Sequence, residues 1–254
     1  MDLRLKDRVA IVTGGSSGIG AATSRLFVQE GAKVAIFARD RERGERIAGE
    51  ISDLGGECVF LRVDVSLEDQ VREGFKVAVE KFGRVDILVN NAGIYEKGDI
   101  FSFTEKDFQE LVDVNIKGVL LCTKYAVEDM RKRSSGVIVN VSSEAGIVGI
   151  QNQVIYNLTK SAVIAITKSC ALDLAPYGIR VNCVCPGTTH TPLVDKAREK
   201  YKDAKPPIKI LSRVRALDRW GMPEEIASAI VFLSSDIVSY ATGTILSVDG
   251  GYTI

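Results

Sequence analysis

Metal-binding and disulfide-forming residues are scarce in this chain. It contains one histidine, His190, and five cysteines among 254 residues, with no C-x-x-C pair. A zinc site has little to build on, so we expect no metal. An odd number of scattered cysteines does not suggest a disulfide framework. Cys183 and Cys185 would share one face of a strand, where we expect core packing.

An excess of charge of either sign is also lacking. Lysine and arginine total 33, as do aspartate and glutamate, so the formal net charge is zero. Nucleic-acid-binding domains usually carry a basic excess, so we expect no nucleic-acid partner. No run approaches the ~18 apolar residues that span a bilayer, and residues 1–6 contain no apolar signal segment. We therefore expect a soluble, cytoplasmic protein that does not contact membranes.

The chain does contain a regular alternation of short apolar runs and helical patterns. The apolar runs lie at residues 9–12, 33–38, 58–63, 85–89, 136–141, 179–184 and 244–248. Helical patterns occupy residues 18–30, 47–54, 104–114, 154–174 and 223–234, and Ser66 is expected to open another, with Asp69 three residues later as in a capping box. Non-alternating strands separated by helices predict an α/β fold. We expect a Rossmann-like, doubly wound parallel sheet of about seven strands with helices on both faces.

One segment departs from this pattern. Residues 190–219 are rich in Lys, Arg and Pro and show no clear period. We therefore expect one domain, 1–254, that carries a substrate-loop insertion at about 188–220. The basic residues of this loop could attract an anionic substrate such as an acyl carrier, although interspersed acids make a solvated lid the simpler interpretation. These basic residues are Lys196, Arg198, Lys200, Lys202, Lys205 and Lys209.

A glycine-rich turn follows the first predicted strand. Glycines let the backbone turn tightly and let a phosphate approach, and the next helix supplies free N–H groups at its N-terminus. The spacing G-x-x-x-G-x-G differs from the usual G-x-G-x-x-G, and glycine turns are often purely structural. Its position between strand and helix favours nucleotide binding. The predicted contacts are Thr13, Gly14, Ser16, Ser17, Gly18, Ile19 and Gly20.

The end of the second strand bears on the choice of cofactor. An acid at this point would bind a ribose 2′-hydroxyl and favour NAD, but the slot holds Ala38. Arg39 follows and could pair with a 2′-phosphate. A slip of one residue would place Asp40 there and favour NAD, and Arg39 could also belong to a solvated face. We expect NADP(H) to be favoured over NAD(H).

Tyr156 and Lys160 are four residues apart, so on a helix they share one face. A fixed ammonium can lower the pKa of a phenol by ~1–3, which suits acid–base chemistry, although this spacing is common on helices. Ser143 follows the fifth strand, where a hydroxyl can donate to a carbonyl oxygen; capping is the alternative for it and for its neighbour Ser142. Asn115 is either a satisfied core amide or part of a backbone distortion that holds a water beside Lys160.

These residues, in this order and spacing, resemble the short-chain dehydrogenase/reductase family. The matching motifs are Thr13-Gly14-x-x-x-Gly18-x-Gly20, Asp64-Val65, Asn90-Asn91-Ala92-Gly93, Asn115, Ser143, Tyr156-x-x-x-Lys160 and Pro186-Gly187 with Thr191. The tail at residues 221–252 is similar to that of 3-oxoacyl-carrier-protein reductases and of sugar and polyol dehydrogenases. Such relatives are typically tetramers, so the resemblance implies a homotetramer.

The resemblance also implies roles. Tyr156 would be the general acid/base, Ser143 would polarise the substrate oxygen, Lys160 would lower the pKa of Tyr156 and hold the nicotinamide ribose, and Asn115 would maintain a proton-relay water. The implied cofactor contacts beyond the glycine turn are Arg39, Asp64, Val65, Asn91, Ala92, Gly93, Tyr156, Lys160, Pro186, Gly187, Thr189 and Thr191.

The substrate is less well defined than the reaction. Besides Ser143 and Tyr156, Gln153 is expected to touch it, and Glu144 is bulkier and more charged than expected there, which suggests a polar substrate. The leading interpretation is a 3-oxoacyl-type or general carbonyl reductase. The alternatives are a sugar or polyol dehydrogenase working oxidatively with NAD(P) and, from another class, a non-catalytic NADP-binding regulator.

Overall fold

A computed structural model of the chain describes residues 3–202 and 215–254. The predicted insertion falls partly within this range. Helix α7 (Pro192–Lys200) occupies its first part, whereas Lys205 and Lys209 lie outside the described residues. Within the described ranges, no helix is long and apolar enough to cross a membrane.

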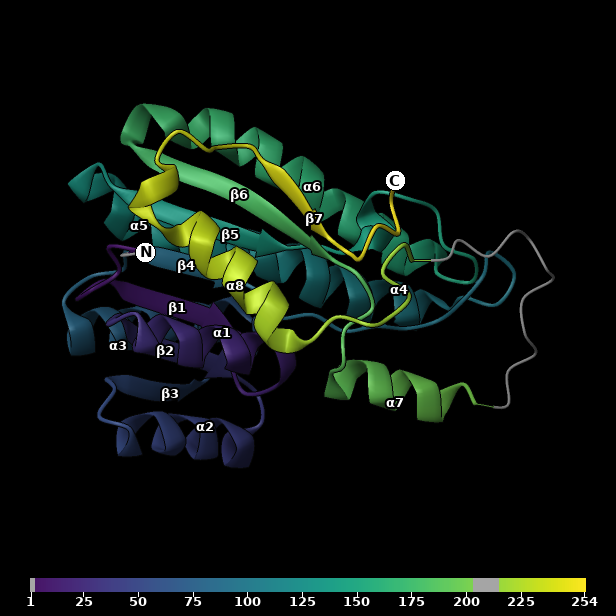
Figure 1. Ribbon diagram of the computed structural model, residues 1–254, viewed down its shortest axis with the longest axis horizontal. Helices are drawn as coiled ribbons and strands as arrows, with labels where there is room; N and C mark the ends of the chain where they lie inside the picture. The colour runs from purple at the N-terminus through teal and green to yellow at the C-terminus, as the bar shows by residue number, and fades with distance from the viewer. Residues whose placement is uncertain (1–2, 203–214) are drawn as a thin grey trace.

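A seven-stranded parallel sheet forms the centre of the molecule (Figure 1). Its strands are β1 (Val9–Thr13), β2 (Lys33–Ala38), β3 (Cys58–Arg62), β4 (Ile87–Asn90), β5 (Gly136–Val141), β6 (Ile179–Pro186) and β7 (Ile245–Val248). They lie in the order β3-β2-β1-β4-β5-β6-β7, and each neighbouring pair is parallel. The strand order reverses between β1 and β4, where the carboxyl ends of parallel strands leave a crevice for ligands. The predicted fold class is therefore confirmed.

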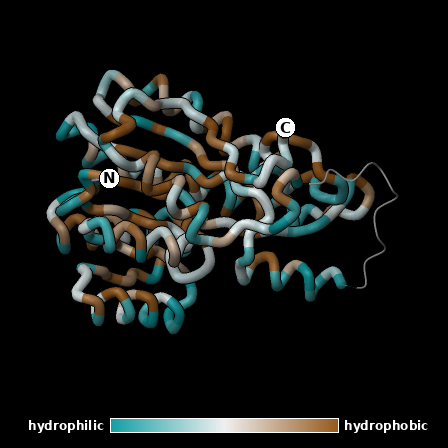
Figure 2. The backbone as a smooth tube through the Cα atoms, viewed as in Figure 1, coloured by the Kyte–Doolittle hydropathy of each residue, from teal (hydrophilic) through white to brown (hydrophobic). Residues whose placement is uncertain are grey.

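Helices cover both faces of the sheet. The main ones are α1 (Gly18–Gln29), α2 (Arg41–Asp53), α3 (Glu68–Phe82), α4 (Glu105–Val112), α5 (Gly118–Arg133), α6 (Val154–Leu174), α7 and α8 (Pro223–Ser234). Hydrophobic residues concentrate along the inner strands, and the chain between and around them is more hydrophilic (Figure 2). This distribution explains the non-alternating strand sequences, because both faces of each central strand are buried.

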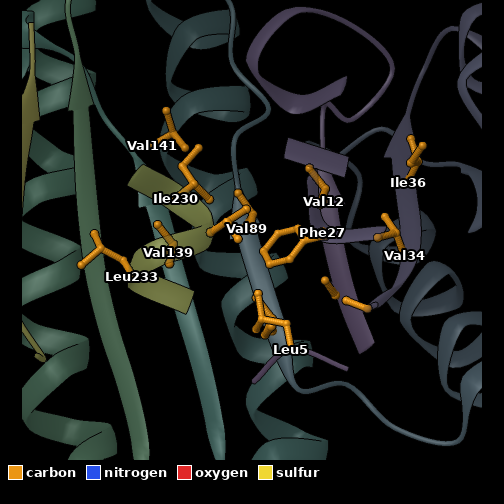
Figure 3. Close-up of a cluster of buried hydrophobic side chains, with 14 of the residues drawn as sticks. Leu5, Val12, Phe27, Val34, Ile36, Val89, Val139, Val141, Ile230 and Leu233 are labelled. Carbon is orange, nitrogen blue, oxygen red and sulfur yellow. The ribbon is translucent and has the colours of Figure 1, made fainter. Parts of the chain in front are cut away.

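One face of the sheet packs against α1, α2 and α8. Phe27 of α1 is fully buried in a cluster with Val12 of β1 and Val89 of β4, and α8 contributes Ile230 and Leu233 (Figure 3). Burying such an aromatic side chain contributes roughly 1.5–3 kcal/mol. This cluster fixes α1, and with it the turn that leads into α1, against the carboxyl end of β1.

The opposite face packs against α3, α5 and α6. Phe37 of β2 meets Phe75 of α3 edge to face, with ring centroids 5.3 Å apart, and α5 adds Ala126 and Met130. Helix α3 differs from the prediction, because it begins at Glu68 rather than at Ser66. The Ser66 hydroxyl donates to Asp64 Oδ1 (2.6 Å) in the preceding loop and therefore does not cap the helix.

The helical pattern that begins near Thr104 contains a distortion. Thr104 caps α4 in a capping box with Asp107, as expected of a helix start. A π-helical turn over Asp113–Lys117 then joins α4 to α5. Such turns are rare and frequently occur at functional sites. The turn contains Asn115, so the backbone distortion predicted there is present.

Candidate active site

A cavity of about 540 Å³ opens at the carboxyl edge of the sheet. Its walls come from the glycine turn after β1, the loops after β4, β5 and β6, and helices α6 and α7. Of the predicted cofactor residues, those lining it are Gly14, Ser17, Gly18, Ile19, Asn91, Ala92, Gly93, Tyr156, Lys160, Pro186, Gly187, Thr189 and Thr191. The remaining predicted residues, Thr13, Ser16, Gly20, Arg39, Asp64 and Val65, do not line it.

The glycine turn needs its glycines. Gly14 and Gly18 have φ values of +64° and +51°, in the left-handed region that favours glycine. A Cβ atom on Gly20 would lie 2.4 Å from the Gly14 carbonyl oxygen. Ser17 caps α1 without a side-chain hydrogen bond, and the first turn of α1 contains no acid. The N–H groups at this helix end are therefore left for an anion.

Thr13 and Asn91 tie the glycine turn to the loop after β4. The Thr13 hydroxyl accepts hydrogen bonds from the backbone N–H groups of Asn91 and Ala92, both at 3.0 Å, and donates to Val89 O. Asn91 Nδ2 donates to Thr13 O at 2.9 Å. These two side chains therefore fix the position of the glycine turn relative to the loop after β4.

Arg39 and Asp40 have different environments. Asp40 caps α2 and its carboxylate lies 2.5 Å from the Arg43 guanidinium. Hydrogen bonds from the backbone and side chain of Arg43 hold the pKa of Asp40 below its usual value. The Arg39 side chain is 63% exposed, and its guanidinium lies 3.8 Å from the Asp64 carboxylate. The carboxylate of Asp40 is thus already engaged, whereas the Arg39 guanidinium projects from the end of β2.

Val65, another predicted cofactor contact, packs beside Gly118 of α5.

Tyr156 and Lys160 lie on one face of α6 and both reach the cavity. Lys160 Nζ is 5.8 Å from the centroid of the Tyr156 ring and donates to Val141 O at 3.1 Å. Burial lowers the pKa of Lys160 to about 8. The predicted geometry of the pair is therefore present.

The expected lowering of the Tyr156 pKa is not produced by the protein's own groups. Burial raises the pKa of Tyr156 to about 12, and the hydrogen bond with Ser143 opposes this rise only partly. Removing the phenolate from water outweighs the favourable contact. Lys160 is also desolvated, so the pair as it stands in the fold does not lower the pKa of Tyr156.

The two serines after β5 have different roles. Ser142 is buried, and its hydroxyl donates to Lys160 O at 2.7 Å, which braces α6 against the sheet. Ser143 accepts a hydrogen bond from the Ala145 backbone at 3.1 Å and also contacts Tyr156. Ser143 combines the capping role with a position in the cavity, and it is the serine beside Tyr156.

Asn115 is a satisfied amide held within the π-helical turn. Its Nδ2 donates to Ile94 O (2.9 Å) and to Thr159 Oγ1 (3.2 Å), and its Oδ1 accepts from Ile94 N (2.9 Å). A Cβ atom on Gly93 would lie 3.4 Å from Asn115 Oδ1 and 3.5 Å from Lys160 Nζ. Both interpretations of Asn115 thus describe part of the structure, and the relay water stays a prediction.

The loop after β6 closes the nicotinamide end of the predicted cleft. Thr189 is buried, and its hydroxyl donates to Gly187 O at 2.9 Å. Thr191 caps α7. A Cβ atom on Gly18 would lie 3.0 Å from Thr191 Cγ2, so the glycine turn and this loop meet.

An aromatic wall that the sequence did not predict completes the cavity. Tyr95 stacks edge to face on Tyr156, with centroids 5.0 Å apart, and on Tyr201, with centroids 6.5 Å apart. Gln153, the predicted substrate contact, lines the cavity beside them and hydrogen-bonds Tyr95. Glu96 accepts hydrogen bonds from the Tyr201 hydroxyl and from Lys200 Nζ. These contacts join the end of α7 to the loop after β4.

A doubly wound sheet whose glycine-lined crevice adjoins a tyrosine, a lysine and a serine defines a class of protein, the dinucleotide-dependent oxidoreductases. The comparisons with known proteins narrow this class. The family model described as enoyl-(acyl carrier protein) reductase matches residues 14–253. The chain belongs to the short-chain dehydrogenase/reductase family and is an oxidoreductase that acts on CH–OH groups or carbonyls.

Individual relatives span the whole chain. A 3-oxoacyl-[acyl-carrier-protein] reductase from Thermotoga maritima is 41% identical over 99% of this chain and 100% of that protein. A cis-4-hydroxycyclohexanecarboxylate dehydrogenase from Sinomonas cyclohexanicum is 41% identical over 97% of both chains. The crystal structure of levodione reductase superimposes with a TM-score of 0.93 at 35% identity, covering 98% of this chain and 99% of that one.

Proposed function

We propose that the protein transfers a hydride between NADP(H) and a ketone or secondary alcohol, with Tyr156 as the proton donor and acceptor. The observation that carries this proposal is the convergence of Tyr156, Lys160 and Ser143 on the cavity that also contains Gly14 and Gly18. A reacting carbonyl at Tyr156 would thus lie beside the glycine-lined crevice.

The residues of the crevice fit a dinucleotide. The turn at Gly14 and Gly18 leaves no room for side chains, and the free N–H groups of α1 suit a pyrophosphate. Pro186, Gly187, Thr189 and Thr191 would hold the nicotinamide end. When bound, the cofactor supplies or accepts the hydride at the substrate carbon.

The protein's own residues would handle the proton. In reduction, Tyr156 Oη gives its proton to the carbonyl oxygen while the Ser143 hydroxyl donates a hydrogen bond to the same oxygen. Lys160 is protonated below a pH of about 8 and places a positive charge near the phenol. Asn115 fixes the π-helical turn and would hold a water molecule beside Lys160. This water would return a proton to Tyr156 through Lys160. Oxidation reverses these steps.

The preference for NADP(H) rests on Arg39. Its guanidinium is exposed at the end of β2, where a 2′-phosphate would lie, whereas Asp40 is engaged by Arg43. A charge-assisted pair between guanidinium and phosphate would favour NADP(H). Asp64 and Val65 would border the adenine.

Two substrate classes compete. The relative from Thermotoga maritima supports a 3-oxoacyl-type or general carbonyl reductase, whereas the relative from Sinomonas cyclohexanicum supports a dehydrogenase of hydroxylated ring compounds, close to the sugar or polyol alternative. The aromatic wall formed by Tyr95 and Tyr201 suits a ring, and Glu144 suits a polar substituent.

The test is a cofactor and substrate panel with purified protein. Acetoacetyl thioesters, simple ketones, cyclic ketones and sugars would be assayed with NADPH, NADH and the oxidised cofactors. We expect ketone reduction with NADPH to exceed that with NADH. Intact NADPH binding without turnover of any compound would favour the non-catalytic regulator.

We propose that residues 1–254 form one domain with the substrate loop at 188–220, that the protein is a cytoplasmic homotetramer, and that no metal takes part. The resemblance of the tail at residues 221–252 to tetrameric relatives supports the tetramer. Size-exclusion chromatography with light scattering would test it.

A further inference from the structure

Glu144 is a buried carboxylate at the wall of the cavity, directly after Ser143. Its side chain is 8% exposed, and its Oε2 has no hydrogen-bond partner among residues 3–202 and 215–254. Leaving a buried carboxylate oxygen unpaired costs the desolvation of that atom. A hydrogen-bond donor from outside residues 3–202 and 215–254 would remove this cost.

Arg215 holds this carboxylate in place. Its Nη2 lies 2.5 Å from Glu144 Oε1, and Thr188 Oγ1 lies 3.4 Å from the same oxygen. The Arg215 guanidinium also stacks 4.7 Å from the centroid of the Tyr252 ring, and its Nε is buried without a partner among the described residues. The ion pair therefore contains one unsatisfied acceptor and one unsatisfied donor.

A hydroxyl group matches the free Glu144 oxygen, because it can donate a hydrogen bond to a carboxylate. The Gly187 backbone lies close by, since a Cβ atom there would be 3.0 Å from Glu144 Oε2. Glu144 itself lines the cavity beside Ser143, so a substrate held at Ser143 would lie next to this side chain.

We propose that Glu144 is a specificity-determining residue that accepts a hydrogen bond from a hydroxyl group which the substrate carries besides its reacting carbonyl. The natural substrate is then a hydroxylated ketone or its polyol product. This inference rests on the proposed carbonyl chemistry and selects one class of ketone substrate within it.

The same carboxylate disfavours a 3-oxoacyl thioester. Near its ketone such a substrate offers a second carbonyl oxygen, which accepts hydrogen bonds but donates none. Placing an acceptor against the free oxygen of this ion-paired carboxylate leaves both acceptors unpaired in a buried site, and such unpaired groups discriminate strongly against a wrong substrate.

The experiment compares two ketones that differ by one hydroxyl, cyclohexanone and 2-hydroxycyclohexanone, with NADPH and the full-length protein. The measured quantity is the ratio of their kcat/KM values. We expect the wild type to prefer the hydroxyketone by about tenfold or more, as for a hydrogen bond to a charged group. Glu144→Gln keeps the shape of the side chain and should bring the ratio down several-fold. Glu73→Gln, on the exposed side of α3, should leave it unchanged.

The outcomes separate the two levels of the proposal. A wild-type ratio near one, or a ratio that Glu144→Gln leaves intact, overturns the role of Glu144 while the carbonyl chemistry stands. Activity with neither these ketones nor the wider panel overturns the proposed function itself. The wild-type ratio needs no variant, so a poorly folding Glu144→Gln does not block the test.

Discussion

The two ends of the cleft are built on different principles. At the proposed adenosine end, Arg39 is 63% exposed and its ionic contact with Asp64 spans 3.8 Å. At the substrate end, Lys160 is buried and Tyr156 is half-buried, and burial is the largest influence on the pKa of each. Charges at the first end are screened by solvent, whereas charges at the second act at close range.

Substitutions at the two ends should therefore have different effects. A screened surface charge contributes little to stability and acts mainly on the ligand that it meets. A buried ionisable group affects the fold and the chemistry together.

The largest effect is expected at the phenol. Tyr156→Phe removes the proton donor and should lower kcat for ketone reduction by roughly 10²- to 10⁴-fold. NADPH affinity and circular dichroism should stay near those of the wild type. Tyr240→Phe, on a fully exposed tyrosine, is the matched control. Wild-type rates in Tyr156→Phe would rule out this proton path.

The buried ammonium should make stability depend on pH. A lysine whose pKa in the fold is about 8, below its ordinary value of 10.5, destabilises the fold while it is protonated. This penalty fades as the pH rises through the folded pKa. The free energy of unfolding of the wild type, relative to Lys160→Met, should therefore rise by roughly 2 kcal/mol between a pH of about 8 and about 10.

Urea unfolding at several pH values would measure this difference. Lys168→Met, on an exposed lysine of the same helix, gives the background change. A difference between wild type and Lys160→Met that stays flat with pH, or that falls, would contradict the buried ammonium.

A smaller and more selective effect is expected at the adenosine end. Arg39→Ala should weaken NADPH binding by about tenfold, the value of one charge-assisted pair, with little change for NADH. Fluorescence titration of both cofactors would measure this. Arg46→Ala, also exposed, should change neither affinity. Equal losses for both cofactors would defeat the predicted preference.

The smallest effect is expected where α7 meets the loop after β4. Tyr201→Phe keeps the ring against Tyr95 but removes the hydroxyl that bonds Glu96. A hydrogen bond in a partly exposed site contributes about 1 kcal/mol, so KM should rise several-fold at most while kcat changes little. A large fall in kcat would mean that Tyr201 takes part in the chemistry.

The sequence predicts those parts of the cleft that are encoded by short motifs of neighbouring residues. The glycine turn, the Tyr156–Lys160 pair and the strand ends are short patterns, and the structure brings them together. The prediction that Ser66 opens a helix is wrong, because its hydroxyl donates to Asp64 in the loop and does not cap α3. The contacts of Glu144 with Arg215 and of Glu96 with Tyr201 join residues far apart in the chain. No period or spacing encodes such pairs, so the substrate end could not be completed from the sequence.

The direction in which the pKa of Tyr156 shifts could not be predicted from the sequence either. The four-residue spacing places a cation near the phenol, but burial depends on tertiary packing by Tyr95 and the loop after β5. In the fold, desolvation is the largest influence on that pKa. A spacing predicts proximity, and only the packing decides which charge state is favoured.

The central claim is that the pKa of Tyr156 falls when the positive nicotinamide of an oxidised cofactor lies beside it. The direct test is the tyrosinate absorbance of the wild type minus that of Tyr156→Phe, titrated with pH in the presence and absence of the oxidised cofactor. We predict a pKa of about 12 for the protein alone and a value lower by about 1–3 with the cofactor bound. An unchanged pKa for Tyr156 on cofactor binding would contradict the account.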